Sequence, residues 1–228
     1  MAKNVFHRLE FKYILNLEQY NAIISEIREN MDHDAYGDKT IQSLYFDTPN
    51  YRLIRESIEK PDFKEKLRLR SYGLVNKESE VFLEMKRKSE KVVYKRRVRL
   101  TEDEAFDFIS KKTDGDDDQI SKELKYFRDY YQNLEPKILL LYDREAYNLD
   151  RLRVTFDTNI RYRLNDLNLS TSLEGIQLDE GLIMMEVKTI HAIPLWLVKL
   201  LSDNKIYKTS YSKYGTAYRK VISKMTNN

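Results

Sequence analysis

The sequence predicts an α+β fold in which helices wrap a closed antiparallel β-barrel of about eight strands. Two observations predict it. Several segments alternate charged and apolar residues with a period of two, and amphipathic helical segments alternate with them along the chain. Because each helix needs an apolar sheet face to cover, we expect the charged faces of the strands to line the inside of the barrel.

The length and composition of the chain indicate one soluble domain. Its 228 residues are 41% apolar, enough to bury a sizeable core. The absence of cysteine excludes disulfide scaffolds, thiol catalysis and cysteine-ligated zinc, and the three histidines are scattered. The sequence has neither a membrane-spanning apolar run nor a signal-peptide pattern, so we expect a single cytoplasmic domain over residues 1–228.

The period-two segments define the predicted strands. Four of them, in the first half of the chain, carry Lys or Arg on one face and mostly apolar residues on the other: 6–15, 63–72, 80–88 and 91–100. A further strand over 40–46 ends at a turn. In the second half we expect strands over 137–147, 151–158, 160–164 and 182–189.

Capping patterns place the helices between these strands. Asn16 with Gln19, and Thr101 with Glu104, are capping-box pairs that open helices at those points. Pro194 opens another short helix. The remaining helices are expected over 50–59, from an acidic loop at 114–118 to about residue 133, and over 210–222.

The charged faces of the predicted strands are mostly basic. They carry twelve cations against three carboxylates, whereas the whole chain has 40 Lys and Arg against 37 Asp and Glu. The cations are Arg8, Lys12, Lys66, Arg68, Arg70, Lys86, Lys88, Lys95, Arg97, Arg144, Arg153 and Lys188; the carboxylates are Glu10, Glu84 and Glu186. One interpretation is a solvated outer sheet face, but like charges opposite one another destabilise a sheet.

A barrel lined by about ten cations repels itself unless a polyanion fills it. Phosphate chains fit best, because Arg binds phosphate oxygens in pairs and Lys acts as a point charge. The sequence has no Walker loop, so side chains would bind the phosphates. The three glutamates offer hard oxygen ligands to Mn²⁺ or Mg²⁺. Alternatively, Glu10 and Glu84 form ion pairs with neighbouring lysines.

An ordered series of short motifs resembles the VTC domain. This is the polyphosphate polymerase domain of the vacuolar transporter chaperone complex, within the triphosphate tunnel metalloenzyme superfamily. The resemblance covers about residues 5–222. Its motifs are RLEFKY at 8–13, SLYFDT at 43–48, KLRLRSYG at 66–73, FLEMKRK at 82–88, YKRRV at 94–98, YDREAY at 142–147, RVTFDT at 153–158, MEVKT at 185–189 and SYSKY at 210–214.

The resemblance implies an eight-stranded tunnel, and an enzyme that transfers the γ-phosphate of ATP onto a growing polyphosphate chain with Mn²⁺ or Mg²⁺. It assigns catalytic phosphate binding to Lys12, Arg68, Arg70, Lys86, Lys95, Arg144 and Arg153. It assigns the metal to Glu186, which Glu10 and Glu84 would join. Further substrate contacts are expected from Tyr142, Ser212 and Lys213, and from Arg8, Lys88, Arg97 and Lys188.

The chain also departs from the family pattern. Arg8 stands where tunnel enzymes have a first carboxylate, which fits the polymerase branch better than the two-metal triphosphatases. Without transmembrane segments of its own, the chain would need a separate membrane partner to export its product. The alternatives are a triphosphatase or cyclase-like tunnel enzyme, and a non-catalytic polyanion-binding module. A net charge of +3 argues against a nucleic-acid partner.

Overall fold

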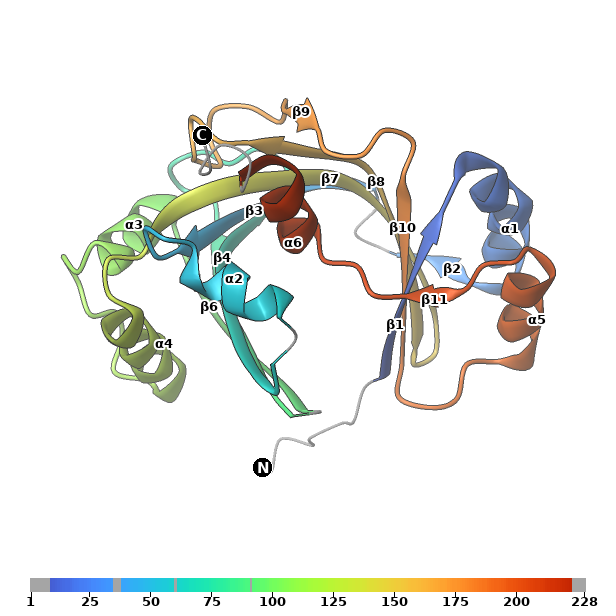
Figure 1. Cartoon of the computed structure of the whole chain (residues 1–228), viewed down its shortest axis with the longest axis horizontal. Helices are drawn as coiled ribbons and strands as arrows, with labels where there is room; N and C mark the ends of the chain where they lie inside the picture. Colours follow the sequence, from blue (N-terminus) through green and yellow to red (C-terminus); the bar gives the residue numbers. More distant parts are fainter. Residues whose placement is uncertain (1–8, 35–37, 60, 91, 223–228) are drawn as a thin grey trace. The chain divides into compact units, whose positions relative to one another are not determined.

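The computed structural model describes residues 9–34, 38–59, 61–90 and 92–222 (Figure 1). The chain divides into two compact units. The first unit comprises residues 1–40, 142–160 and 177–212, and the second comprises 41–141, 161–176 and 213–228. Strands β7 (Glu135–Leu149) and β8 (Leu152–Arg163) contribute residues to both units.

The strands form one sheet, whose order in the described residues is β11-β1-β10-β8-β7-β3-β4-β5-β6, with β2 on β7 and β9 on β8. The other strands are β1 (Leu9–Leu15), β2 (Asp32–His33), β3 (Lys39–Asp47), β4 (Phe63–Tyr72), β5 (Val81–Ser89), β6 (Val92–Leu100), β9 (Ile176–Gln177), β10 (Ile183–Thr189) and β11 (Lys208–Thr209). Eight of these strands have seven or more residues, as predicted. The order ends at β11 and β6, so barrel closure stays a prediction.

In the first unit, two helices cover the apolar face of the sheet. Helix α1 (Leu17–Asn30) begins at Asn16, whose side chain and that of Gln19 form the predicted capping box. Buried isoleucines of α1 and buried leucines of α5 (Leu195–Asp203) pack in one core with apolar residues of β1, β8 and β10 (Figure 1). The charged residues of these strands therefore lie on the face opposite the helices.

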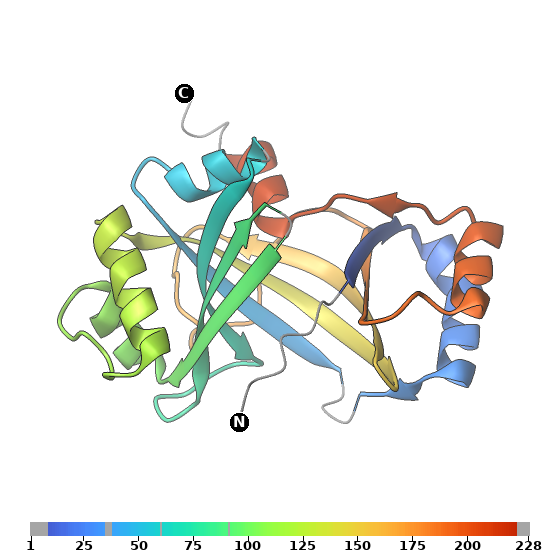
Figure 2. The same ribbon diagram turned by 90° about the horizontal axis from the view of Figure 1, so that it is seen from below.

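The second unit repeats this arrangement. Helices α3 (Glu102–Ile109) and α4 (Gln119–Tyr131) pack against the alternate apolar residues of β4 and β5, including Leu67, Leu69 and Leu83 (Figure 2). Helix α2 (Arg52–Ile58) and helix α6 (Lys213–Ala217), which continues as a π-helical turn over Tyr218–Ile222, lie next to each other. The predicted covering of the apolar strand faces by helices is confirmed within each unit.

Two predicted boundaries are wrong. The segments 151–158 and 160–164 form a single strand, β8. Asn159, between them, adopts a left-handed conformation (φ 49°), but the strand continues through it. Asparagine tolerates this conformation better than most residues. The C-terminal helix begins at Lys213 rather than at residue 210, and residues 210–212, which follow β11, belong to neither a helix nor a strand.

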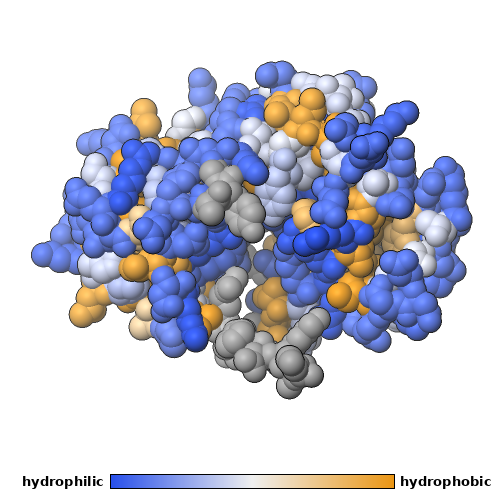
Figure 3. Space-filling view, turned by 180° about the vertical axis from the view of Figure 1, so that it is seen from behind, coloured by the Kyte–Doolittle hydropathy of each residue, from blue (hydrophilic) through white to orange (hydrophobic). Residues whose placement is uncertain are grey.

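The surface is rich in charge, as 34% charged residues require. Figure 3 shows mostly hydrophilic side chains on the face drawn, with hydrophobic ones scattered among them. None of the helices in the described residues is both long enough and apolar enough to cross a membrane.

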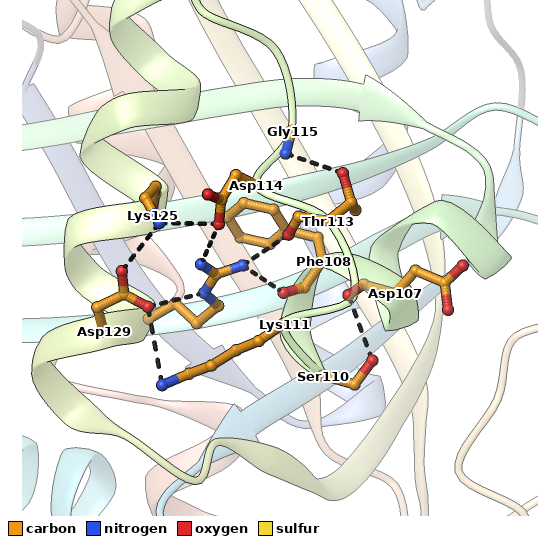
Figure 4. A network of polar contacts seen from close by, with 10 residues as sticks. Asp107, Phe108, Ser110, Lys111, Thr113, Asp114, Gly115, Lys125 and Asp129 are labelled. Carbon is orange, nitrogen blue, oxygen red and sulfur yellow. Dashed lines mark hydrogen bonds and ion pairs between the residues drawn. The ribbon is translucent and has the colours of Figure 1, made fainter.

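A buried guanidinium ties α4 to the acidic loop that precedes it. The Arg128 side chain is 2% exposed and donates to the carbonyl oxygens of Phe108 and Thr113, both at 2.8 Å. It also donates to Asp114 at 2.8 Å and Asp129 at 3.1 Å, and it lies over the Phe108 ring (Figure 4). The acidic loop is thus anchored to the unit by Arg128.

We predict that Arg128→Met destabilises the protein by about 2–4 kcal/mol, because the buried carbonyl of Phe108 and the part-buried carbonyl of Thr113 lose their donor. The matched control on the same helix is Lys122→Met, since Lys122 is 57% exposed and forms an ion pair with Asp117, which is 96% exposed. That variant should cost less than about 1 kcal/mol. Urea unfolding curves measure both, and equal losses would contradict the anchoring role of Arg128.

Candidate functional site

The register of β4, β5 and β6 gathers nine cations on one face of the second unit. Lys66, Lys86 and Lys95 lie side by side in one cross-strand row, and Arg68, Glu84 and Arg97 in the next. We call this surface the nine-cation face; it consists of Lys64, Lys66, Arg68, Arg70, Lys86, Lys88, Lys95, Arg97 and Arg99. The opposite face of these strands packs on α3 and α4. The sequence prediction that these cations share a face is confirmed.

Glu84 is the carboxylate at the centre of this face. Its side chain is 1% exposed, and its oxygens lie 2.7 Å from Arg68, 2.6 Å from Lys95, 3.6 Å from Arg97 and 3.8 Å from Arg70. Burial alone would raise the pKa of Glu84, but Arg70, Arg68 and Lys95 outweigh it and lower the pKa to about 2. Both oxygens are occupied by cations, which favours the ion-pair alternative for Glu84 over metal ligation.

Tyr45 links the nine-cation face to the C-terminal helix. It lies opposite Arg68 in register, and its hydroxyl accepts from the Arg68 guanidinium at 3.2 Å. Its ring stacks on Tyr214 of α6 at 4.6 Å. Burial would raise the pKa of Tyr45, but Arg68, Arg70 and Lys213 lower it overall. The α6 residue Lys213, predicted to bind substrate, is therefore placed beside this face.

Asp47 fixes α6 and α2 to the end of β3. It is fully buried and accepts from the backbone amides of Leu53 and Ile54 at the start of α2. It also accepts from the Tyr214 hydroxyl at 2.9 Å. Burial raises the pKa of Asp47. Its hydrogen bonds hold two helices at one point, so Asp47 is a structural residue of the site.

The first unit carries a second, smaller charged face. Lys12 of β1 lies opposite Glu186 of β10, and Glu10 lies opposite Lys188, so acid and base alternate on neighbouring strands. Lys12 is 3.5 Å from Glu10 and 3.9 Å from Glu186, and Lys188 forms an ion pair with Glu186. Burial would raise the pKa of Glu186, but Lys188, Lys12 and Arg144 lower it well below the usual range.

Two arginines of the first unit are held by carboxylates that the sequence analysis missed. Arg144 makes a bidentate pair with the fully buried Asp157, at 2.6 and 2.8 Å. Arg153 binds Asp34 at 2.7 Å. The alternation of β8 could have revealed Asp157, which shares the parity of Arg153. Nothing in the local pattern indicated Asp34, which is 119 residues away from its partner.

The residues around Glu186 fit a hard divalent cation. The described residues contain no cluster of three or more His, Asp or Glu side chains that could hold a metal by themselves. Glu10 and Glu186 are diagonal neighbours across β1 and β10. Thr155, opposite Glu186 on β8, has a buried hydroxyl with no hydrogen-bond partner among the described residues. Lys12 and Lys188 pair with the two oxygens of Glu186, so a metal would bind here in exchange for these lysines. Two carboxylates and a hydroxyl then suit Mg²⁺ or Mn²⁺ when phosphate oxygens complete the coordination.

Three of the remaining predicted substrate contacts lie within the described residues, and one does not. Tyr142 is 3% exposed, and the Arg144 guanidinium lies 5.3 Å from its ring centroid. Ser212 and Lys213 are half-buried at the start of α6. Arg8 lies outside the described residues. The roles proposed for all of these side chains stay predictions.

We predict that Glu84 makes stability depend on pH in the acid range. A folded pKa of about 2, below the usual 4.5, means that its stabilisation is complete above pH 4.5 and is lost as pH falls towards 2. Its full contribution is about 3 kcal/mol. Urea midpoints at pH 4.5 and 3 should therefore differ less in Glu84→Gln than in the wild type.

The control for this experiment is Glu80→Gln, because Glu80 is 66% exposed and lies just before β5. That variant should keep the wild-type pH dependence. A Glu84→Gln protein that loses as much stability as the wild type between pH 4.5 and 3 would show that Glu84 is not the strongly ionised centre of the face.

Comparisons with known proteins agree with this geometry. The model of the VTC domain family matches residues 7–222. The crystal structure of a candidate adenylate cyclase from Bacillus halodurans is 15% identical, with a TM-score of 0.59 over 97% of this chain and 100% of that chain. A candidate adenylyl cyclase from Hippeastrum, described as revealing a dominant triphosphatase activity, is 13% identical, with a TM-score of 0.57 over 93% and 95% of the two chains.

No curated protein matches the chain. At such low identities the two solved structures show a shared fold and nothing more. The family match covers almost the whole sequence and therefore shows which family the chain belongs to. The matched range includes every strand and helix that carries a predicted site residue among the described residues. The chain therefore belongs to the VTC domain family, with the fold of the triphosphate tunnel proteins.

Proposed function

We propose that this protein is a metal-dependent polyphosphate polymerase, which transfers the γ-phosphate of ATP onto a growing polyphosphate chain. The observation that carries the proposal is the nine-cation face with its single buried carboxylate, on a chain of the VTC family. Such a concentration of Lys and Arg around one acid suits a ligand with many negative charges. Membership of the family supports polyphosphate as that ligand.

The proposed reaction needs positioning and charge stabilisation rather than a protein nucleophile. A terminal phosphate oxygen of the acceptor chain attacks the γ-phosphorus in line; the bond to the β–γ bridging oxygen breaks, and ADP leaves. In the second unit, Arg68 and Arg70 would hold equatorial oxygens, and Lys86 and Lys95 would hold the chain. In the first unit, the same roles are proposed for Arg144 and Arg153, and for Lys12.

Preorganisation supports these roles. Arg68 is fixed by Glu84, Arg144 by Asp157 and Arg153 by Asp34, so three guanidinium groups are already oriented before any substrate arrives. Groups held in place cost little reorganisation when charge develops in the transition state. Glu186 and Glu10 would hold Mn²⁺ or Mg²⁺, which neutralises phosphate charge when bound.

A triphosphatase is the second candidate. The diagonal placement of Glu10 and Glu186 favours it, because two nearby carboxylates can both hold metal and orient an attacking water. A non-catalytic polyanion-binding module would use the same cations without either reaction. The products formed from ATP separate these three functions.

The proposal also includes the finer features that the resemblance implies. These are closure of the sheet into a tunnel, residence in the cytoplasm and a separate membrane partner that exports the product. The eight long strands and the basic strand faces support the tunnel. The family match supports ATP and polyphosphate as the ligands.

The first test is incubation of purified protein with ATP and Mn²⁺, followed by a gel stained for polyphosphate. The polymerase is expected to form long chains and ADP, and to need the metal. Release of free phosphate without chains would establish the triphosphatase instead. If neither polyphosphate nor free phosphate forms, the protein is a non-catalytic polyanion-binding module.

Two variants separate metal binding from phosphate binding. We predict that Glu186→Gln reduces synthesis about 100-fold but keeps most of the rise in melting temperature caused by triphosphate, because it removes a metal ligand and no cation. Arg70→Ala should weaken both, by about 100-fold in synthesis, since it removes a buried guanidinium that would donate to the phosphate oxygens. Thermal melting with triphosphate, against sodium chloride of equal ionic strength, measures the binding.

Matched controls are Glu180→Gln and Arg151→Ala, because both residues are exposed and neither lies on a charged strand face. These variants should behave like the wild type in both measurements. Full synthesis by Glu186→Gln would remove Glu186 from the proposed site, and an unchanged triphosphate shift in Arg70→Ala would do the same for Arg70.

A further inference from the structure

Two aromatic rings stand at one end of the nine-cation face. Phe82 of β5 lies opposite both Arg70 and Arg99, and Tyr72 follows Arg70 by two residues on the same face of β4. The two rings meet edge to face, with centroids 6.0 Å apart and planes at 78°. Aromatic rings thus stand beside the arginines at this end of the face.

Arginine side chains stack beside this edge-to-face pair, with the Arg97 guanidinium lying over one face of the Phe82 ring. The Arg97 guanidinium lies 3.5 Å from the centroid of the Phe82 ring, and the Arg99 guanidinium lies 5.9 Å from it. The Tyr72 ring remains 45% exposed and the Arg97 side chain 36% exposed. Planar groups that are both accessible and neighbouring are the usual surface on which nucleobases stack.

The distance from this surface to the phosphate-binding cations suits a nucleotide. Tyr72 lies four positions after Arg68 on β4, which corresponds to about 13 Å along an extended strand. Arg70 lies between them, with its side chain 10% exposed. An extended nucleoside triphosphate has a comparable length, with its base at one end and its phosphates at the other.

We propose that Tyr72, Phe82 and Arg97 form a stacking platform for the nucleobase of the phosphoryl donor, with its phosphates on Arg70 and Arg68. This inference rests on the proposed use of a nucleoside triphosphate. Stacking recognises the face of a ring rather than its hydrogen-bonding edge, so the platform accepts nucleobases as a class. ATP and GTP should bind alike, and inorganic triphosphate should gain nothing from the platform.

The test compares ligands that share their phosphates and differ in the base. Dissociation constants of ATP, GTP and inorganic triphosphate are measured by titration calorimetry at one MgCl₂ concentration, for the wild type, Tyr72→Leu and Phe82→Leu. Each variant should weaken ATP and GTP about tenfold, the usual effect of losing one stacking ring. Triphosphate binding should stay within about twofold of the wild type.

Phe63→Leu is the matched control. Phe63 is 50% exposed and has the Arg87 guanidinium 5.8 Å from its ring centroid, but it lies on the opposite face of β4. It should leave all three constants unchanged. Should Phe82→Leu fail to fold, the more exposed Tyr72→Leu decides the question.

Equal weakening of ATP and triphosphate, or no weakening of either, would overturn the platform. These outcomes are distinct from failure of the proposed function. A protein that makes no polyphosphate but loses purine binding in Tyr72→Leu would keep the platform and lose the polymerase. A polymerase with unchanged constants in both variants would keep its function and lose the platform.

Discussion

The repulsion among cations on one sheet face is the constraint on which the site depends. Nine Lys and Arg side chains share the face formed by β4, β5 and β6, and Glu84 sits among four of them. Because Glu84 is buried, its attraction for Arg68, Arg70 and Lys95 is screened less than it would be in water. This attraction helps the fold to tolerate nine cations on one sheet face.

The apolar half of each strand makes this arrangement possible. Leu67, Leu69 and Leu83 alternate with the cations and pack under α3 and α4, so the free energy of burial is gained on one side of the sheet. The first unit follows the same rule with α1 and α5. There the cations are fewer, and carboxylates such as Glu186 and Asp157 balance them more closely. The two units thus differ in the net charge of their strand faces.

Period-two alternation made most of the fold predictable from sequence. It placed β1, β4, β5 and β6, and the capping boxes at Asn16 and Thr101 placed the first residues of two helices. The pattern could not reveal partners that meet only through tertiary pairing, such as Asp34 with Arg153. Tyr45 was missed because its strand is buried on both faces and shows no alternation. The strand boundary predicted at Asn159 is wrong, because asparagine is common in turns and here stands inside a strand in a left-handed conformation.

The order of the strands has a consequence for how the site is made. Strands β4, β5 and β6 follow one another in the chain and pair in that same order. Their contacts span short stretches of sequence, which is the arrangement that folds fastest. The nine cations are therefore brought together by pairings between neighbouring segments, without any distant part of the chain. Glu84 is carried by the middle strand, so each hairpin of this sheet contains the counter-ion for its own charges.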